Sequence, residues 1–322
     1  MKYMVLTARH HDGYSLFNSR VSDFTSVKTA AGRDLVGEYA EACRKAGLKV
    51  GFYYSLDDWR FPCRGPRLDQ AVWRDMVQYV HAQVKELMTN YGRVDILWYD
   101  ISGCYRDKKG KPPTAADWDS KKLNDMARKL QPHILINNRS GLPEDFDTAE
   151  QNLNASLPGR LWESCLTMNN HWGWFPADPL WKPTRSLVHT LTACAYSGGN
   201  FLLNVGPKPD GTIPSQSVRR LKEMGRWLKV NGEAIYGVGR SGFPTGTAGC
   251  AAERGKTIYV FVHWWPGSVL TLPQVDIEIK SARILGCSRK VVLAREGRRL
   301  FLKNLPAQAP DRLTTVIALE RT

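Results

Sequence analysis

Short apolar segments alternate with amphipathic ones along the first two thirds of this 322-residue chain, and this alternation restricts the folds open to it. The apolar runs have the length of strands: residues 3–8 (YMVLTA), 49–55 (KVGFYYS) and 94–99 (VDILWY). Residues 69–91 instead repeat apolar side chains at helical spacing and end before Gly92. Continuous apolar strands that alternate with helices predict an α/β fold, with a parallel sheet covered by helices.

Polar residues follow many of these strands directly. They are His10, His11, Ser55, Asp100, Asn138, Arg139, Glu163 and Asn204. In a (β/α) barrel the carboxyl ends of all strands open onto one rim, where active sites are built. A doubly wound sheet would gather its ligand groups at one switch point, and the sequence contains neither a GxGxxG nor a Walker loop. The pattern therefore favours a TIM-like (β/α) barrel.

The pattern changes at about Gly239. Residues 257–264 (TIYVFVHW), 275–279 and 315–319 are short strand-like runs with stretches of period two, separated by glycine and proline turns. This is typical of a small antiparallel β-sandwich. We therefore predict a barrel domain over residues 1–236 and a C-terminal sandwich over residues 237–322.

Charge and composition exclude several classes of protein. The 45 basic and 31 acidic residues give a net charge of +14, but the basic residues are scattered and no nucleic-acid motif accompanies them. We expect a solvated basic surface, with a polyanion-binding protein as a weaker alternative. No apolar run approaches the roughly 20 residues of a membrane-spanning helix, and no secretory leader precedes the first strand. The sequence as given predicts a cytoplasmic protein without a membrane partner.

Two carboxylates carry the chemistry that the residues themselves indicate. Asp100 ends an apolar strand beside Trp98, and Glu150 lies in a polar, loop-like stretch. A loop carboxylate above a rim carboxylate is the arrangement of glycoside hydrolysis. Plainer alternatives remain open: Asp100 as a helix cap, Glu150 as a solvated side chain, and the tryptophan-rich turns as structural packing. His10 and His11 lack the HExxH spacing of a zinc site, and the seven cysteines lack CxxC pairs, so the spacing predicts no metal site.

Several longer motifs occur together and in order. They are TARHHDGYSLFNSRVSDF, EACRKAGLKVGFYYSLDDW, DILWYD, INNR, TAEQ, LWESCLTMNNHWGW and GGNFLLNVGPKPDGTIP. In this combination the chain resembles glycoside hydrolase family 29, the α-L-fucosidases, from Lys2 to about Tyr236. The resemblance implies a (β/α) barrel followed by a β-sandwich, and a retaining hydrolase that removes terminal α-L-fucosyl groups from glycans or glycoconjugates through a covalent fucosyl-enzyme intermediate, without metal or cofactor.

The resemblance also implies residue roles. Asp100 matches the family nucleophile, and Glu150 in TAEQ matches the general acid/base, with Glu163 in the WES motif as second candidate. The residues that match sugar-binding positions are His10, His11, Tyr53, Trp98, Arg139 and Trp172. Two other functions stay open on the same residues: a catalytically impaired carbohydrate-binding relative, and an enzyme that mainly transfers fucose to acceptor sugars.

Two features depart from the family pattern. Met1 falls just before what resembles the second barrel strand, so the first strand and its HWG-type motif have no counterpart here. An open barrel leaves unpaired sheet edges, and we expect a homo-oligomer, a rearranged barrel or another segment to cover them. Ile101 follows Asp100 where the family commonly has glycine, which predicts a differently shaped loop beyond the nucleophile.

Overall fold

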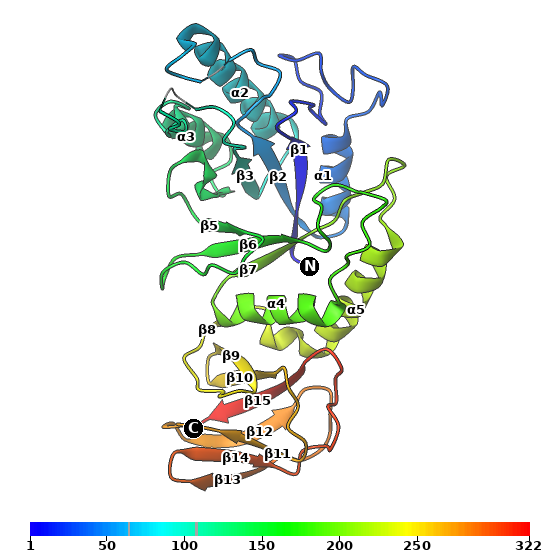
Figure 1. Ribbon diagram of the computed structural model, residues 1–322, viewed down its shortest axis with the longest axis vertical. Coiled ribbons are helices and arrows are strands. Elements are labelled where there is room, and N and C mark those ends of the chain that lie inside the picture. Colours follow the sequence, from blue (N-terminus) through cyan, green and yellow to red (C-terminus); the bar gives the residue numbers. More distant parts are fainter. Residues whose placement is uncertain (64, 107–108) are drawn as a thin grey trace. The chain divides into compact units, whose positions relative to one another are not determined.

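The computed structural model describes residues 1–63, 65–106 and 109–322 (Figure 1). The chain divides into two compact units, Met1–Thr148 and Ala149–Thr322, each with its own sheets. The domain boundary predicted at residue 236 stays a prediction. Across the described residues, none of the helices combines the length and the apolar character that crossing a bilayer requires.

The first unit alternates strands and helices, which confirms the alternation predicted for it. Its elements are β1 (Tyr3–Arg9), α1 (Leu35–Lys45), β2 (Lys49–Ser55), α2 (Gln70–Asn90), β3 (Ile96–Asp100), α3 (Ser120–Leu130), β4 (Leu135–Ile136) and the 3-10 helix η1 (Asn138–Ser140). The strands pair in the order β1-β2-β3-β4, and every pairing is parallel. The carboxyl ends of β1, β2 and β3 therefore lie at one edge of the sheet (Figure 1).

Local sequence signals explain where the helices of this unit begin and what they bury. Asp34 caps α1 by accepting a 2.8 Å hydrogen bond from the backbone N–H of Gly37. The apolar face of α2 is buried in the core of the unit; its residues include Trp73, Met76, Val80, Val84 and Leu87. Gly13, in the turn after β1, has a φ of +77° and lies so close to Asp58 and Arg60 that a Cβ there would meet their side-chain atoms at 2.5 Å.

The fourth strand is shorter than the sequence predicts, and a side chain explains why. The apolar run 134–138 forms a strand only over Leu135–Ile136. The buried amide of Asn137 donates to the carbonyl of Tyr99 and accepts from its N–H, both at 2.9 Å. A side chain thus takes the place of the next pair of ladder bonds, and the backbone turns into η1, which carries Arg139.

The second unit contains a short mixed segment and a set of antiparallel strands. Its elements are β5 (Asp147–Glu150, which begins in the first unit), β6 (Trp162–Thr167), α4 (Thr184–Tyr196), β7 (Asn200–Asn204), α5 (Ser215–Asn231), the 3-10 helix η2 (Gly232–Ala234), β8 (Gly239–Arg240), β9 (Gly249–Arg254), β10 (Thr257–Val262), β11 (Val269–Leu272), β12 (Ile279–Ile284), β13 (Val292–Glu296), β14 (Arg299–Lys303) and β15 (Thr315–Arg321). Strands β5-β6-β7 form one sheet, in which β6 and β7 are parallel.

The antiparallel strands form the predicted sandwich. A five-stranded sheet, β12-β15-β10-β9-β8, packs on a three-stranded sheet, β11-β14-β13, through one apolar core. Alternate residues of β10 serve two cores: Ile258 and Val260 lie in the sandwich core, while Tyr259 and Phe261 lie in a core shared with α4 and α5. This is why β10 has no polar alternation from Ile258 to Val262.

The described sheets do not form a closed barrel. Closure requires each strand to pair along both edges. Within the described residues β1 pairs only with β2, and β4 only with β3, so the sheet of the first unit is open. The parallel α/β architecture is thus confirmed, whereas ring closure is not.

Candidate active site

Asp100 is the centre of a polar cluster at the carboxyl edge of the first unit's sheet. It is the last residue of β3, and its side chain is 14% exposed. The hydroxyl of Tyr53 donates to Oδ2 at 2.6 Å, and Nη1 of Arg139 donates to Oδ1 at 2.5 Å. Both oxygens act as acceptors, which is the role of an ionised carboxylate. The alternative of a helix cap does not describe Asp100, because α3 begins only at Ser120.

The aromatic side chains beside Asp100 follow from strand register. Tyr53 of β2 and Trp98 of β3 are register partners, so both lie on the same face of the sheet. Their rings stack with centroids 5.5 Å apart, and His10 stacks on the other face of Tyr53 at 5.5 Å. The guanidinium of Arg139 lies 4.7 Å from the centre of the Trp98 ring. The flat groups thus form a continuous column, in the spatial order His10, Tyr53, Trp98 and Arg139. We call it the stacked column below.

His11 is held by a short chain of hydrogen bonds. The Ser55 hydroxyl donates to the carbonyl of Asp57 at 3.0 Å, and its oxygen lies 2.6 Å from Nδ1 of His11. Since the only hydrogen of that hydroxyl is already used, Nδ1 of His11 must donate to it. The Nε2 atom of the neutral ring therefore carries a lone pair, and it lies 3.6 Å from Oδ2 of Asp100.

The charge state of His11 agrees with this arrangement. Burial and the neighbouring His10 lower the pKa of His11, and they outweigh the opposing effect of Asp100. The ring is consequently neutral at neutral pH. It presents an acceptor nitrogen to the site, suited to a hydroxyl group of a bound molecule.

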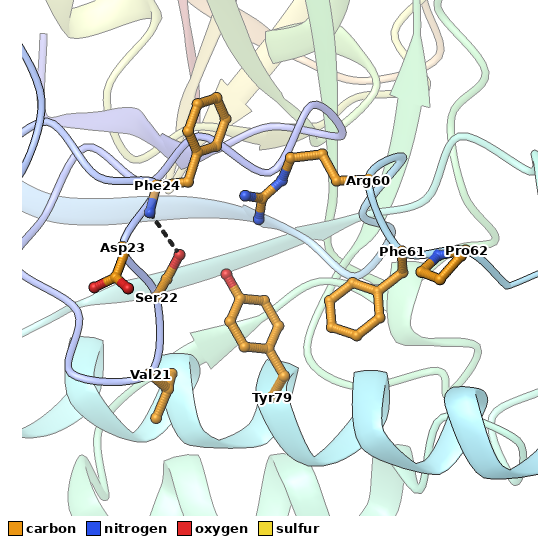
Figure 2. Close-up of a pocket in the computed structure, with 8 residues that line it drawn as sticks. All are labelled: Val21, Ser22, Asp23, Phe24, Arg60, Phe61, Pro62 and Tyr79. Atoms are coloured by element: carbon orange, nitrogen blue, oxygen red, sulfur yellow. Dashed lines mark hydrogen bonds between the residues drawn. The ribbon is translucent and has the colours of Figure 1, made fainter.

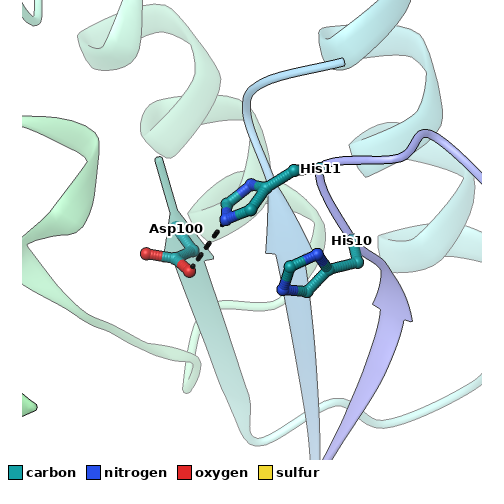
Figure 3. Close-up of side chains that lie close together, drawn as sticks. All are labelled: His10, His11 and Asp100. Atoms are coloured by element: carbon teal, nitrogen blue, oxygen red, sulfur yellow. Dashed lines mark ion pairs between the residues drawn. The ribbon is translucent and has the colours of Figure 1, made fainter. Parts of the chain in front are cut away.

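The rings of His10 and His11 and the carboxylate of Asp100 face a common space (Figure 3). The two imidazole centroids are 4.2 Å apart, and one ligand atom from each of the three residues lies within 4.8 Å of the others. His10 is exposed while His11 is buried. This is the group of side chains in the described chain whose composition fits a metal ion, although the sequence predicts no metal cofactor.

The loop that follows Asp100 is tied back to the loop that follows β2. The buried carboxylate of Asp57 accepts hydrogen bonds from both the backbone N–H and the hydroxyl of Ser102. The indole of Trp59 donates to the same hydroxyl at 3.2 Å. The polar residues predicted at the strand ends include Ser55, but sequence reasoning did not select Asp57 or Ser102 as site residues. The signal that could have found Asp57 is the run SLDDW, placed directly after a buried strand.

A separate hollow of about 620 Å³ lies elsewhere in the first unit (Figure 2). It is lined by residues 21–24, by Arg60, Phe61 and Pro62 after β2, and by Tyr79 of α2. The Arg60 guanidinium lies 4.5 Å from the centre of the Phe24 ring and is paired with Asp58. None of the predicted site residues lines this hollow.

The other predicted residues belong to the second unit. Glu150 is exposed and is the last residue of strand β5, so the prediction of a loop is wrong at this position. The next residue, Gln151, donates its backbone N–H to the carbonyl of Cys165 in β6. Glu163 is buried in β6, and Trp172 is 40% exposed. The separation between Glu150 and Asp100 stays a prediction.

The six predicted residues of the first unit thus form one cluster with a defined chemistry. It combines a carboxylate, a cation and a phenol that hold it, an acceptor imidazole and a flat aromatic wall. A carboxylate held in this way can attack an electrophilic carbon, and aromatic walls suit the apolar face of a sugar.

Comparisons with known proteins agree with this arrangement. The family model described as Alpha-L-fucosidase matches residues 1–233. The α-L-fucosidase of Dictyostelium discoideum is 32% identical over 253 residues, which cover 73% of this chain and 53% of that protein. This chain therefore spans about half the length of that curated relative.

Solved structures extend the similarity to the whole chain. The α-L-fucosidase isoenzyme 1 of Paenibacillus thiaminolyticus superposes with a TM-score of 0.91 at 36% identity, covering 100% of this chain and 83% of that one. The α-fucosidase of Thermotoga maritima, solved with a mechanism-based inhibitor, gives 0.84 at 32% identity over 99% of this chain and 76% of that one. The chain belongs to the α-L-fucosidase family, glycoside hydrolase family 29.

Proposed function

We propose that this protein is a retaining α-L-fucosidase that removes terminal α-L-fucosyl groups from glycans or glycoconjugates. The observation that carries the proposal is the carboxylate of Asp100, held at both oxygens by Tyr53 and Arg139 at the carboxyl edge of a parallel sheet. Family membership and the relative solved with a mechanism-based inhibitor support it.

In the first step, an oxygen of Asp100 attacks the anomeric carbon of the fucosyl group. The bond between that carbon and the glycosidic oxygen breaks, and the carboxylic acid of Glu150 gives its proton to the departing oxygen. The products are an alcohol and a fucosyl ester of Asp100. Tyr53 and Arg139 orient the attacking carboxylate and spread its charge before the attack.

In the second step, the carboxylate of Glu150 takes a proton from a water molecule whose oxygen attacks the same carbon. The ester bond breaks, Asp100 is released as a carboxylate, and Glu150 is again an acid. Two inversions give net retention, which requires the two carboxyl groups to be about 5–5.5 Å apart. Glu163 is the second candidate for the acid/base.

The remaining residues bind the sugar in this proposal. Neutral His11 accepts a hydrogen bond from a fucose hydroxyl at Nε2, and His10 contacts a neighbouring hydroxyl. Trp98 and Trp172 pack against apolar parts of the sugar. We also propose that residues 1–236 form the catalytic, TIM-like barrel domain and residues 237–322 the sandwich, as the similarity to solved fucosidases suggests.

The first test is hydrolysis of 4-nitrophenyl α-L-fucoside, with proton NMR to identify the anomer of fucose released first. We expect α-L-fucose, and an Asp100→Ala variant at least about 1,000-fold slower in kcat/KM. Release of β-fucose first would exclude the retaining mechanism. Binding of fucose without turnover by the wild-type protein would instead identify a carbohydrate-binding relative.

Azide distinguishes the two acid/base candidates. Glu150→Ala should slow hydrolysis of poorly activated fucosides by about 10²–10⁴-fold, and added azide should restore turnover of the aryl fucoside with α-L-fucosyl azide as product, because azide replaces water in the second inversion. The matched variant is Glu163→Ala. Azide rescue in that variant, and none in Glu150→Ala, would assign the acid/base role to Glu163.

A further inference from the structure

We propose that His10, His11 and Asp100 form a binding site for one divalent transition-metal ion, Cu²⁺ or Zn²⁺, and that the bound ion excludes the sugar. The three residues lie at the carboxyl ends of β1 and β3, and one ligand atom of each lies within 4.8 Å of the other two (Figure 3). The exclusion of sugar rests on the proposed function, whereas the metal site does not.

The first argument is the orientation of His11. Its Nδ1 donates to Ser55, whose hydrogen is committed to the carbonyl of Asp57. Metal-binding histidines characteristically donate their second ring N–H to an oxygen atom in this way, which fixes the tautomer and directs the other nitrogen at the ion. The ligand nitrogen of His11 is therefore oriented before any ion arrives.

The second argument is an arrangement of lone pairs that face each other. Nε2 of His11 and Oδ2 of Asp100 are 3.6 Å apart, and neither has a hydrogen to share with the other when the ring is neutral. A cation between them turns this unfavourable contact into two favourable ones.

The third argument concerns distances. Zinc–nitrogen bonds are about 2.0–2.1 Å long, so two ligand nitrogens of a tetrahedral ion are about 3.4 Å apart. The ligand atoms, which lie within 4.8 Å of one another, must therefore approach by up to about 1.5 Å. His10 is exposed and stacks almost parallel to Tyr53, with 3° between the rings, so a small sliding movement within the stacked column closes the gap.

Ligand type decides which ions bind. Two imidazoles and one carboxylate suit Cu²⁺ and Zn²⁺, whereas Mg²⁺ and Ca²⁺ prefer all-oxygen sites. Three protein ligands also leave coordination positions for water. The positive charge of Arg139 on the other oxygen of Asp100 opposes the ion, so the affinity is lower than that of a structural zinc site.

The experiment uses the full chain after removal of metals with EDTA and gel filtration. Titration with Zn²⁺ by calorimetry should give one site per chain, and the electron paramagnetic resonance spectrum of the Cu²⁺ complex should show coupling to two imidazole nitrogens. His10→Gln and His11→Gln should each weaken Zn²⁺ binding at least 10-fold and remove one nitrogen coupling. Mg²⁺ should not bind.

His133→Gln and His263→Gln are the matched controls. His133 lies outside the cluster, and His263 belongs to a second histidine pair, with His189, whose rings are 4.0 Å apart. Both controls should retain the site. Unchanged Zn²⁺ affinity in His10→Gln and His11→Gln, or loss of binding in His263→Gln, would overturn the proposal.

Competition separates this proposal from the proposed function. Zn²⁺ should raise the KM for the aryl fucoside without changing kcat, and EDTA should reverse the effect. One bound ion in a protein that cleaves no fucoside would refute the proposed function and leave the metal site intact. Fucoside cleavage without zinc binding would refute the metal site and leave the proposed function intact. Noncompetitive inhibition by Zn²⁺ would refute the exclusion of sugar.

Discussion

One ion pair from the first unit and one from the sandwich differ sharply in their exposure to water. In the first unit, Arg9 and Asp58 form an ion pair at 2.6 Å in which both side chains are fully buried. In the sandwich of the second, Arg298 and Asp276 pair at the surface, with side chains 64% and 62% exposed. The parallel sheet thus carries charge inside, next to the candidate site, whereas the sandwich relies on apolar packing. Stability and function are expected to respond differently to substitution in the two regions.

The largest expected effect on stability comes from the buried pair. Asp58 accepts hydrogen bonds from both Arg9 and Arg60, so Asp58→Ala leaves the buried guanidinium of Arg9 without its carboxylate. Removing one partner of a buried pair typically costs about 3–5 kcal/mol in the free energy of unfolding. Chemical denaturation monitored by tryptophan fluorescence measures it.

The matched control is Asp276→Ala, which removes the carboxylate of the exposed pair and should leave stability almost unchanged. Equal losses in the two variants would remove the contrast between the units.

A slightly smaller loss is expected in the sandwich core. Leu302 of β14 is fully buried between the two antiparallel sheets, so Leu302→Ala should cost about 3 kcal/mol. Val292→Ala, at a 47% exposed position of neighbouring β13, should cost far less. In the folded variants kcat/KM should match that of the wild type, and a selective loss of kcat/KM in Leu302→Ala would connect the sandwich to the site.

A substitution of Ser55 tests substrate binding in the first unit rather than stability. Ser55→Ala removes the acceptor for Nδ1 of His11, so we expect a rise in KM of about 10-fold, which corresponds to about 1.4 kcal/mol, with little change in kcat. Nitrogen-15 chemical shifts report the tautomer directly. Wild-type His11 should carry its proton on Nδ1, and the variant should show a mixture. An unchanged tautomer would mean that Ser55 does not position this ring.

A further effect on stability depends on pH and belongs to the second unit. Burial, together with His189 and Arg185, lowers the pKa of His263 to about 4. The unfolded histidine titrates near 6.5, so between pH 6.5 and 4 the unfolded chain binds more protons, and stability falls as the pH falls. His263→Gln should show a shallower decline than the wild type in denaturation curves between these pH values. Parallel declines would exclude this contribution.

Much of the first unit could be predicted from periodicity. The predicted helix over residues 69–91 is α2, at 70–90, and Asp100 ends its strand as expected. Tyr53 and Trp98 are both predicted as site residues, and the structure places them at corresponding positions of neighbouring parallel strands.

What could not be predicted depends on side chains that bond to distant backbone. The amide of Asn137 shortens β4 by bonding to Tyr99, and the carboxylate of Asp57 holds the loop at Ser102; both contacts join residues about 40 positions apart. Pairing with β6 makes a strand of the residues up to Glu150, although their sequence is typical of a loop. Closure of a barrel likewise depends on strand pairings that no local pattern contains.

Strand β10 contributes side chains to two cores, and this has a consequence for anyone who shortens the protein. Its Tyr259 and Phe261 cover Leu187 of α4 and Trp227 of α5, residues that precede the predicted sandwich in the sequence. Ending the chain near residue 236 would expose this helical surface to water and leave it prone to aggregation. The C-terminal strands are thus part of what keeps those helices soluble, and an expression variant without them is a different folding problem from the intact chain.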